Sequence, residues 1–324
     1  MILTVTPNPC VDKTLFIDAL RPGEKIRAPR CTSIAGGKGC NVSRAVKAMG
    51  RDTIAMPMVG GATGAHVVEL LEQQDGIRCA PVWVGAMTRT ITTVLEEPIH
   101  RQTALFEPGP QVTEAECAAF MERFEAVAPT ASLVTFNGSA PDPKLDSLYR
   151  DLVACAQKHG VRSIVDAYGT IFARALEARP YMVKPNIEEA EQWLGRPLRD
   201  REAQWTAVDA LLEQGVALVV LSLGAEGALV ADGRQRFHMR PPAIEEVNPV
   251  GSGDALVAGF AIGLVEGMEL METARLGVAM GAANALSWDI GRFTAEQVHD
   301  LMPKCSGDRM PNLRSGQSGA SYGK

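Results

Sequence analysis

The sequence predicts an α/β fold with a parallel β-sheet and a second, small β-sheet. Short β-rich runs alternate with helical patterns along most of the chain, as they do in stacked βα units. Residues 217–222 form a continuous apolar run, which is typical of a parallel strand covered on both faces. Residues 11–34 and 88–106 instead alternate polar and apolar side chains, and this pattern indicates antiparallel strands with one face in solvent.

The elements of the α/β part follow one another in a regular order. We expect strands at residues 2–6, 53–58, 132–136, 162–166, 181–184 and 217–222. We expect helices at residues 41–49, 65–74, 113–127, 143–159, 187–194, 202–214, 254–266 and 269–287. Asn41 is a favourable N-cap for the first of these helices, and Gly50 follows its end.

These patterns divide the chain into three parts. Residues 1–10, 36–86 and 109–304 are expected to form the α/β core, and residues 11–35 and 87–108 the small β-sheet. Residues 305–324 are rich in Gly and Ser and have no apolar periodicity, so we expect a disordered tail there.

Composition indicates a soluble globular protein. The chain has 324 residues, of which 46% are hydrophobic and 22% charged, and this excludes disordered, collagenous and coiled-coil proteins. A formal charge of −6 argues against a nucleic-acid partner. No apolar run approaches the ~20 residues of a membrane helix, and the first residues do not resemble a signal peptide, so we expect a cytoplasmic protein with no membrane partner. The seven cysteines and five histidines show no zinc-site spacing, so we expect reduced thiols and no structural zinc.

The glycine cluster at residues 35–45 is the first motif that could bind a ligand. It is not a P-loop, because Thr32 stands where that motif requires Gly and Gly39 where it requires Ser or Thr. Exposed N–H groups at a helix start suit a polar or anionic ligand. An ordinary glycine turn explains the same pattern equally well.

The second motif, at residues 248–256, places Gly251, Ser252 and Gly253 directly before Asp254. Free N–H groups at a helix start can stabilise charge on a transferring phosphoryl group while the carboxylate accepts a proton. Asp254 could instead only stabilise the helix N-terminus. The helix that follows is so apolar that the segment must be buried, and a buried carboxylate requires a reason.

Two further motifs follow the carboxyl ends of expected strands, where open parallel sheets bind ligands. Ser222, Gly224 and Gly227 could hold a nucleotide, or they could form a plain turn between two strands. Asn186 and Glu189 could orient water around Mg²⁺, or they could be a capping pair at a helix start.

Together the four motifs resemble those of the PfkB (ribokinase-like) carbohydrate kinases, in order and spacing, from about residue 1 to about residue 300. Within that family the chain is most similar to the hexose-phosphate branch, which contains 1-phosphofructokinase, tagatose-6-phosphate kinase and the minor 6-phosphofructokinase. Residues 4–12 and 137–141 resemble segments of that branch. The resemblance implies a three-layer core of Rossmann type that carries the ATP site, and a small β-sheet lid that often forms the dimer contact.

The resemblance also implies roles for individual residues. Asp254 would be the catalytic base, and Gly251, Ser252 and Gly253 the anion hole. The residues expected to bind the substrate are Asp12, Lys25, Arg27, Gly37, Lys38, Asn41, Arg89 and Ser139. The residues expected to bind the nucleotide are Lys184, Ser222, Gly224, Gly227 and Asn284. Asn186 and Glu189 match the pair associated with Mg²⁺ through water.

The implied reaction is ATP-dependent phosphorylation of a phosphorylated ketohexose to the bisphosphate, by a homodimer formed through the lid. The substrate could be fructose 1-phosphate, tagatose 6-phosphate or fructose 6-phosphate. Lys25, Arg27 and Arg89 favour a phosphosugar, since a phosphate dianion needs cations to offset its desolvation, although a solvated basic face would look the same. The alternatives are a kinase of a free sugar or nucleoside, a nicotinamide dehydrogenase, and a non-catalytic sugar-phosphate-binding protein. A dehydrogenase fits the α/β pattern, but the sequence lacks the glycine fingerprint of dinucleotide-binding proteins.

Overall fold

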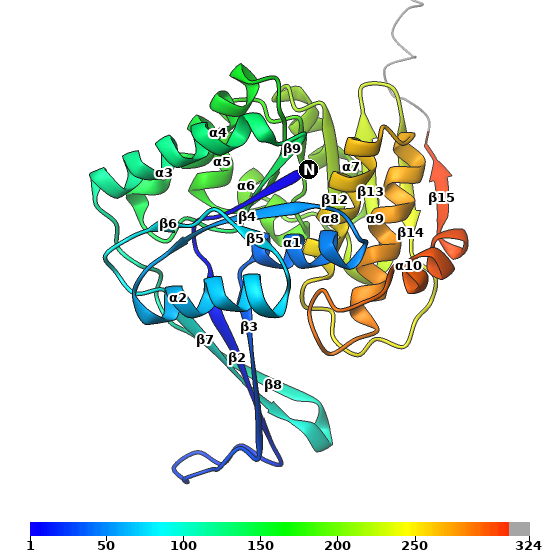
Figure 1. Ribbon diagram of the computed structural model, residues 1–324. Coiled ribbons are helices and arrows are strands. Elements are labelled where there is room, and N and C mark those ends of the chain that lie inside the picture. The colour runs from blue at the N-terminus through cyan, green and yellow to red at the C-terminus, as the bar shows by residue number, and fades with distance from the viewer. Residues whose placement is uncertain (311–324) are drawn as a thin grey trace, which may run out of the picture.

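An 11-stranded β-sheet forms the centre of the molecule (Figure 1). The structure is a computed structural model that describes residues 1–310. The strand order is β15-β14-β13-β12-β11-β10-β9-β1-β4-β5, and β6 also pairs with β4. The strands from β12 to β5 are parallel, whereas β13, β14 and β15 add to one edge in antiparallel fashion. Their bounds are β1 Ile2–Thr6, β4 Thr53–Val59, β5 Arg78–Cys79, β6 Val82–Trp83, β9 Leu133–Asn137, β10 Arg162–Asp166, β11 Met182–Val183, β12 Leu218–Ser222, β13 Ala228–Asp232, β14 Arg236–Arg240 and β15 Ser306–Arg309.

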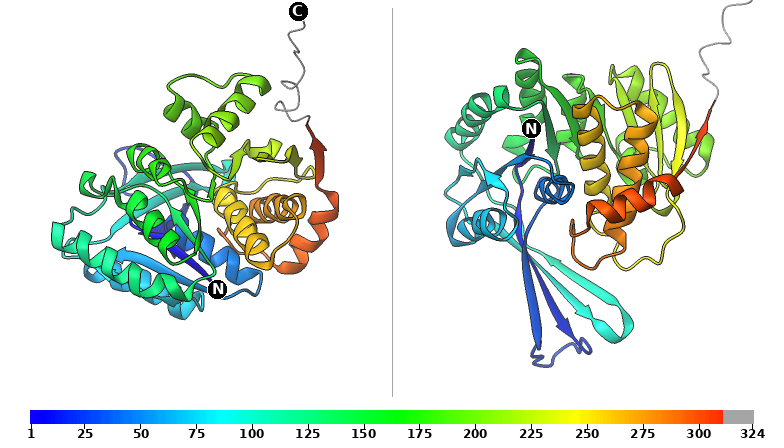
Figure 2. Two further views of the ribbon diagram at one scale, coloured as in Figure 1. Left: turned by 90° about the horizontal axis from the view of Figure 1, so that it is seen from above. Right: turned by 45° about the vertical axis from the view of Figure 1, so that its right-hand side comes forward.

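Helices cover both faces of this sheet, so the body has three layers (Figures 1 and 2). One face carries α3 (Glu114–Val127), α4 (Leu148–Lys158), α5 (Thr170–Glu177), α6 (Ile187–Leu194) and α7 (Arg201–Glu213). The other face carries α1 (Lys38–Ala48), α8 (Ser252–Glu266), α9 (Leu270–Ala285) and α10 (Ala295–Leu301). A smaller apolar cluster packs α2 (Gly61–Glu69) against β4 and the root of the second sheet. Within residues 1–310, no helix has the length and apolarity needed to cross a membrane.

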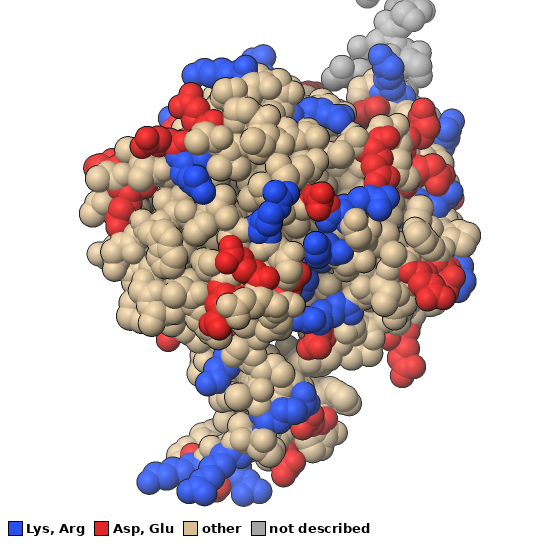
Figure 3. Space-filling model, viewed as in Figure 1, with Lys and Arg blue, Asp and Glu red and all other residues tan. Residues whose placement is uncertain are grey.

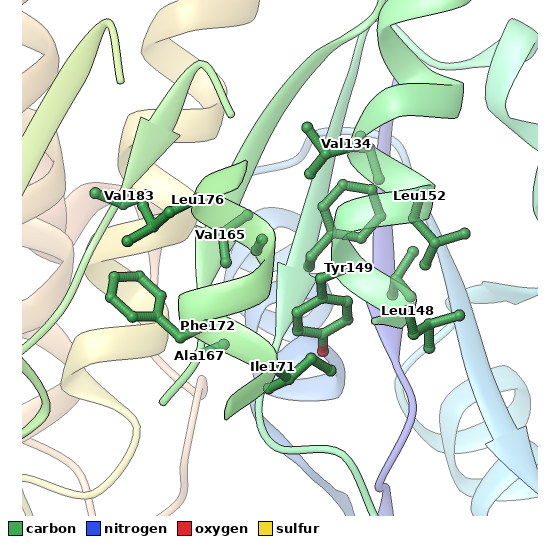
Figure 4. Packing of buried hydrophobic residues seen from close by; sticks show 14 of the residues in the cluster. Val134, Leu148, Tyr149, Leu152, Val165, Ala167, Ile171, Phe172, Leu176 and Val183 are labelled. Atoms are coloured by element: carbon green, nitrogen blue, oxygen red, sulfur yellow. The ribbon is translucent and has the colours of Figure 1, made fainter. Parts of the chain in front are cut away.

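Two large apolar cores lie between the sheet and these helix layers. In the first, Tyr149 of α4 and Phe172 of α5 are almost completely buried over Val134 and Val165 of the sheet (Figure 4). The phenol of Tyr149 donates a hydrogen bond of 2.8 Å to the backbone carbonyl of Asn137, at the carboxyl end of β9. This packing fixes the strand ends from which the site is built.

The second sheet has four strands in the order β3-β2-β7-β8 and projects from the body (Figure 2). Its strands are β2 Cys10–Ile17, β3 Arg30–Gly36, β7 Arg89–Glu96 and β8 Arg101–Phe106. The expected small separate sheet is therefore present, and we call it the lid. The expectation of purely antiparallel pairing is wrong, because β2 and β7 are parallel neighbours. Each follows a parallel strand of the body, β1 and β6, so both leave the same edge of the main sheet in the same direction.

Several element bounds differ from the sequence expectation. Helix α1 begins at Lys38 rather than Asn41, because Gly37 adopts a φ of +108° and lets the helix start there; Asn41 is therefore not its N-cap. Helix α2 begins at Gly61, and the expected helix at 143–159 is divided into a short 3₁₀ turn and α4. The predicted tail begins too early: residues 306–309 form strand β15, which pairs with β14, while residues 311–324 lie outside the described residues.

Candidate active site

A cavity of about 920 Å³ opens where the lid meets the body. Its walls come from the lid, from the carboxyl ends of the central strands, and from the first turns of α1 and α8. Most of the residues singled out from sequence meet there although they are far apart in the chain. The predicted residues that line the cavity are Asp12, Gly37, Lys38, Asn41, Arg89, Lys184, Asn186, Ser222, Gly224, Gly227, Gly251, Ser252, Gly253 and Asp254.

Asp254 lies in the first turn of α8, and only 6% of it is exposed. Its carboxylate accepts a hydrogen bond of 2.8 Å from the side-chain amide of Asn41 in α1. Burial, and next the negative charge of Asp166, raise the pKa of Asp254 to about 7, although Lys38, Asn41 and Lys184 act in the opposite direction. A carboxylate with such a pKa can accept a proton near neutral pH.

The loop before Asp254 presents backbone N–H groups to the cavity. Gly251 has a φ of +83°, and a Cβ there would lie 2.3 Å from the side chain of Ile290, so only glycine fits. The N–H of Ser252 is taken up by a backbone carbonyl of the preceding turn, at 3.1 Å. Within residues 1–310 the N–H groups of Gly253 and Asp254 have no such partner, so they remain available to an anion.

Two lysines and Asp166 form a charged cluster beside Asp254, although none of the predicted site residues is Asp166. This carboxylate is fully buried at the end of β10 and accepts from the Nζ atoms of Lys38 at 3.0 Å and Lys184 at 3.2 Å. Burial alone would raise its pKa, but the two lysines hold the pKa below its usual value. Its other oxygen, Oδ2, is buried without a hydrogen-bond partner among the described residues. The signal was present in the sequence, because an acidic residue ends an apolar strand there.

Asn186 and Glu189 form a capping box at the start of α6. The Asn186 side chain accepts from the N–H of Glu189 at 2.8 Å, and the Glu189 carboxylate accepts from the N–H of Asn186 at 2.9 Å. Glu189 also accepts from Lys38 Nζ at 3.0 Å. Asn186 lines the cavity, whereas Glu189 does not. The prediction of a capping pair is therefore confirmed, and Glu189 reaches the cavity lining only through its contact with Lys38.

The lid forms the wall opposite Asp254. Asp12 and Ile91 project from its pocket side, and Arg89 lies at its root, where it donates to the backbone carbonyl of Asn8 at 3.2 Å. The Nε of Arg89 is buried without a hydrogen-bond partner among the described residues. Burial raises the pKa of Asp12, while Arg44 and Arg89 lower it.

Lys25 and Arg27 are not brought to the cavity. Both are exposed in the loop between β2 and β3, at the free end of the lid, and neither lines the pocket. Figure 3 shows basic side chains gathered at this end of the molecule. The expectation that these two residues join Arg89 within one chain is therefore not met, because the lid strands carry them away from the body.

The remaining wall combines a turn with an apolar slot. Ser222, Gly224 and Gly227 form a turn between the antiparallel strands β12 and β13, so the expected plain turn and a cavity-lining position are both present. The apolar residues of the lining include Pro242, Ile244, Leu256, Val278, Ala282 and Ala285.

Two predicted binding residues instead support the walls. Asn284 is fully buried and does not line the cavity; its amide donates to the carbonyl of Val250 at 2.8 Å and accepts from the N–H of Gly291 at 2.8 Å. It thereby holds the glycine loop in place. Ser139 accepts from the side chain of Asn8 at 3.3 Å and also lies outside the lining.

Comparison with known proteins decides the family. The model of the pfkB family carbohydrate kinases matches residues 5–289. The chain belongs to this family. It is also 35% identical over 303 residues to the 1-phosphofructokinase of Xanthomonas campestris pv. campestris, which covers 92% of this chain and 95% of that protein.

Solved structures of the family share the fold of this kinase. The tetrameric inhibited form of phosphofructokinase-2 from Escherichia coli superimposes with a TM-score of 0.87 at 30% identity, over 94% of this chain and 98% of that one. The same enzyme in complex with fructose-6-phosphate gives a TM-score of 0.83 at 30% identity, with the same coverage. The predicted ribokinase-like fold and the predicted enzyme class, a sugar kinase, are therefore confirmed, and the dehydrogenase alternative is wrong.

Proposed function

We propose that this kinase transfers the γ-phosphoryl group of ATP to a hydroxyl of a ketohexose phosphate and so forms a bisphosphate. The observation that carries the proposal is the position of Asp254. It lies with the free N–H groups of α8 between two walls, one carrying Asp12 and Arg89 and the other a glycine turn with an apolar slot. The names of the relatives support the substrate class, since one is a 1-phosphofructokinase and another was solved with fructose-6-phosphate.

In this mechanism Asp254 removes the proton of the attacking hydroxyl. The hydroxyl oxygen forms a bond to the γ-phosphorus while the bond from that phosphorus to the bridging oxygen of ADP breaks, and the proton passes to the Asp254 carboxylate. The Asn41 amide, 2.8 Å from the carboxylate, keeps it turned toward the cavity. General base catalysis of this kind typically contributes about 10²–10⁴-fold to the rate.

The charge that develops on the transferring group is met by fixed donors. The N–H groups of Gly253 and Asp254 point from the first turn of α8, where the helix dipole also favours an anion. Lys184 adds a positive charge, since its Nζ lies 3.6 Å from the position that a Cβ would take at Gly253. The apolar slot beside the glycine turn is the place proposed for the adenine ring, with Ser222, Gly224 and Gly227 along its edge.

The donor set at the strand ends fits Mg²⁺, which prefers carboxylate oxygens and retained waters. Asp166 and Asn186 are among the residues that line the cavity, and we propose that their side chains hold the ion through water, with Glu189 behind them. When bound, Mg²⁺ neutralises charge on the nucleotide phosphates. Lys38 and Lys184 keep Asp166 ionised and so preserve its oxygens as acceptors.

Arg89 is the cation proposed for the phosphate already on the sugar. Arg89 lines the cavity, its Nε has no hydrogen-bond partner among the described residues, and a guanidinium at a cavity wall is a strong site for a phosphate oxygen.

The lid also suggests a homodimer, since Leu105 and Phe106 of its outer strand are 62% and 68% exposed. Light scattering tests this association, and a monomer at micromolar concentration with and without substrate would contradict it.

A coupled ADP-release assay tests the proposed reaction. Fructose 1-phosphate, fructose 6-phosphate and tagatose 6-phosphate are compared as substrates, with unphosphorylated fructose as the matched control. We expect at least one hexose phosphate to exceed fructose by about 10- to 150-fold in kcat/KM, the value of a charged hydrogen bond to phosphate. Equal turnover of fructose would favour the free-sugar kinase, and ADP release with none of these compounds would refute the proposal.

A further inference from the structure

A cluster of three metal-binding side chains lies on α3 and α4, outside the active site. A carboxylate oxygen of Glu125, the Sγ of Cys155 and a ring nitrogen of His159 all lie within 4.8 Å of one another. Cys155 and His159 are one helical turn apart at the end of α4, and Glu125 comes from α3. None of the three lines the catalytic cavity.

The protein does not use these donor atoms elsewhere. Within residues 1–310, none of the three side chains makes a hydrogen bond or an ion pair with any other group. Cys155 is buried at the base of the cluster, while Glu125 and His159 are exposed and free to turn inward. Donors of a tetrahedral zinc site are about 3.3–3.6 Å apart, so side-chain rotation is enough to close the cluster around an ion.

We propose that Glu125, Cys155 and His159 bind Zn²⁺ or a similar thiophilic divalent cation, with water as the fourth ligand. Thiolate, imidazole and carboxylate are the ligands that zinc takes in proteins. The bound ion joins α3 to α4 and stabilises the folded state by mass action. No spacing motif in the sequence indicates this site, because Glu125 is thirty residues from Cys155 and the two meet only in the fold.

Titration of the full-length, untagged protein with Co²⁺ tests this site. About one equivalent is expected to give a thiolate-to-cobalt charge-transfer band and the d–d bands of a tetrahedral ion, which Zn²⁺ then removes. The band should vanish in Cys155→Ser, persist in the matched control Cys117→Ser, and require at least about tenfold more Co²⁺ in Glu125→Gln or His159→Gln. Binding at the proposed magnesium site gives no thiolate band. Absence of the band in the wild type, or its survival in Cys155→Ser, would overturn the proposal.

A second, independent observation concerns Arg44 of α1, which is only 4% exposed. Its guanidinium donates to the side-chain oxygen of Asn41 at 3.1 Å, to the carbonyl of Ala35 at 2.7 Å and to Asp75 at 3.0 Å. With its oxygen turned to Arg44, the Asn41 amide must direct its NH₂ group to Asp254, at 2.8 Å.

We infer that Arg44 is a positioning residue that fixes the amide of Asn41 and, through it, the orientation of Asp254; this rests on the proposed role of Asp254. Asp75 in turn holds Arg44 from the other side and also accepts from Arg292 at 3.2 Å. Three bonds in different directions leave the guanidinium one orientation, so the amide it contacts has one orientation as well.

A double-mutant cycle between Arg44 and Asn41 tests this chain of contacts. Arg44→Met is expected to lower kcat by about tenfold with the KM for ATP within about twofold, and to have little further effect in an Asn41→Ala background. The exposed Arg51→Met is the matched control and should keep wild-type kinetics. If Arg44→Met does not fold, Arg44→Lys enters the same cycle. If the two substitutions have additive effects on kcat in an active, folded enzyme, the positioning role of Arg44 is wrong while the proposed function stands. The proposed function itself would fail only if Asp254→Asn kept its activity.

Discussion

The two walls of the cavity differ in how firmly the protein holds them. On the body side, Asp254, Asn41, Asp166 and Lys184 are all 9% exposed or less. Hydrogen bonds or ion pairs of 2.8–3.2 Å join Asn41 to Asp254 and Lys184 to Asp166. These side chains stand on helices and strands that pack into the two large apolar cores. The groups assigned to the chemistry therefore have little freedom to move.

The lid wall is a thin sheet with solvent on much of its surface. Asp12 and Arg89 are half-buried, and the outer strand β8 is exposed along almost its whole length. Beyond its root, the lid meets the body where the rings of Phe16 and Trp288 pack edge to face at 6.2 Å. This difference indicates that the reaction and the recognition of the substrate are divided between the two walls. The fixed groups of the body suit proton and phosphoryl transfer, whereas the thin sheet of the lid can open for the substrate and close over it.

The largest expected effect comes from the body wall. Asp254→Asn is expected to lower kcat by about 10²–10⁴-fold, because the amide keeps the shape of the carboxylate and accepts no proton. Circular dichroism and ATP binding should remain as in the wild type. Asp300→Asn, an exposed carboxylate of α10, is the control. A variant that keeps more than about a tenth of the wild-type kcat would show that another group is the base.

A change in the lid wall is expected to act on the sugar phosphate alone. Arg89→Ala should reduce kcat/KM for the hexose phosphate by about 10- to 150-fold, since a charged hydrogen bond to phosphate is lost. The KM for ATP should change little, because Arg89 contacts Asn8 just after β1, whereas the glycine turn follows β12, and β9, β10 and β11 lie between these two strands. Arg101→Ala is the matched control, as this lid arginine is paired with Glu96 outside the cavity. Equal losses of kcat/KM for the hexose phosphate and for ATP would contradict the proposal that the lid wall binds only the sugar phosphate.

The pH dependence of kcat/KM is expected to report the buried base. Asp254 accepts a proton only when it is ionised, and its pKa is about 7. Activity should therefore rise with pH and level off above about pH 8, with a value at pH 6 about tenfold below the plateau. A profile that stays flat down to pH 5 would indicate that Asp254 has an ordinary pKa in the free enzyme.

The smallest expected effect is on stability. Because the pKa of Asp254 is raised from 3.8 to about 7 on folding, the folded protein binds more protons than the unfolded chain between those values. The free energy of unfolding therefore falls as the pH rises through this window. The amide of Asp254→Asn has no proton to lose, so the variant avoids this decrease in the free energy of unfolding. Its Tm should be about 2–5 °C above that of the wild type at pH 8 and unchanged at pH 4. Thermal unfolding at both pH values measures this difference in Tm. An unchanged Tm at pH 8 would contradict the prediction that the buried Asp254 carboxylate destabilises the folded protein.

Periodicity was enough to predict most of the α/β core, because buried strands and amphipathic helices carry their pattern locally. Strand β15 was missed for the opposite reason. Its residues, Ser306–Arg309, have no apolar alternation, and the strand exists only through backbone pairing with β14 at the edge of the sheet. The parallel pairing of β2 with β7 likewise follows from where the two strands leave the body, which no local pattern records.

The candidate site was predictable where a motif concentrates its chemistry in a few residues, as around Asp254. It was not predictable where a role depends on distant contacts. Asp166 gains its importance from Lys38, 128 residues away, and from Lys184. Lys25 and Arg27 have the right charge for a phosphate, but the lid strands carry them to its free end. Charge and spacing suggest a partner, and only the fold decides which groups meet.

Calorimetric titration of a hexose phosphate into Asp254→Asn tests the division between the two walls most directly. The hexose phosphate with the highest turnover in the ADP-release assay is the ligand, and Asp254→Asn with Arg89→Ala is the comparison protein. We expect Asp254→Asn to bind it with a Kd close to the KM of the wild type. Adding Arg89→Ala should weaken that binding by about tenfold or more. Loss of binding in Asp254→Asn alone, or equal binding by both proteins, would contradict the separation of catalysis in the body from phosphosugar recognition on the lid.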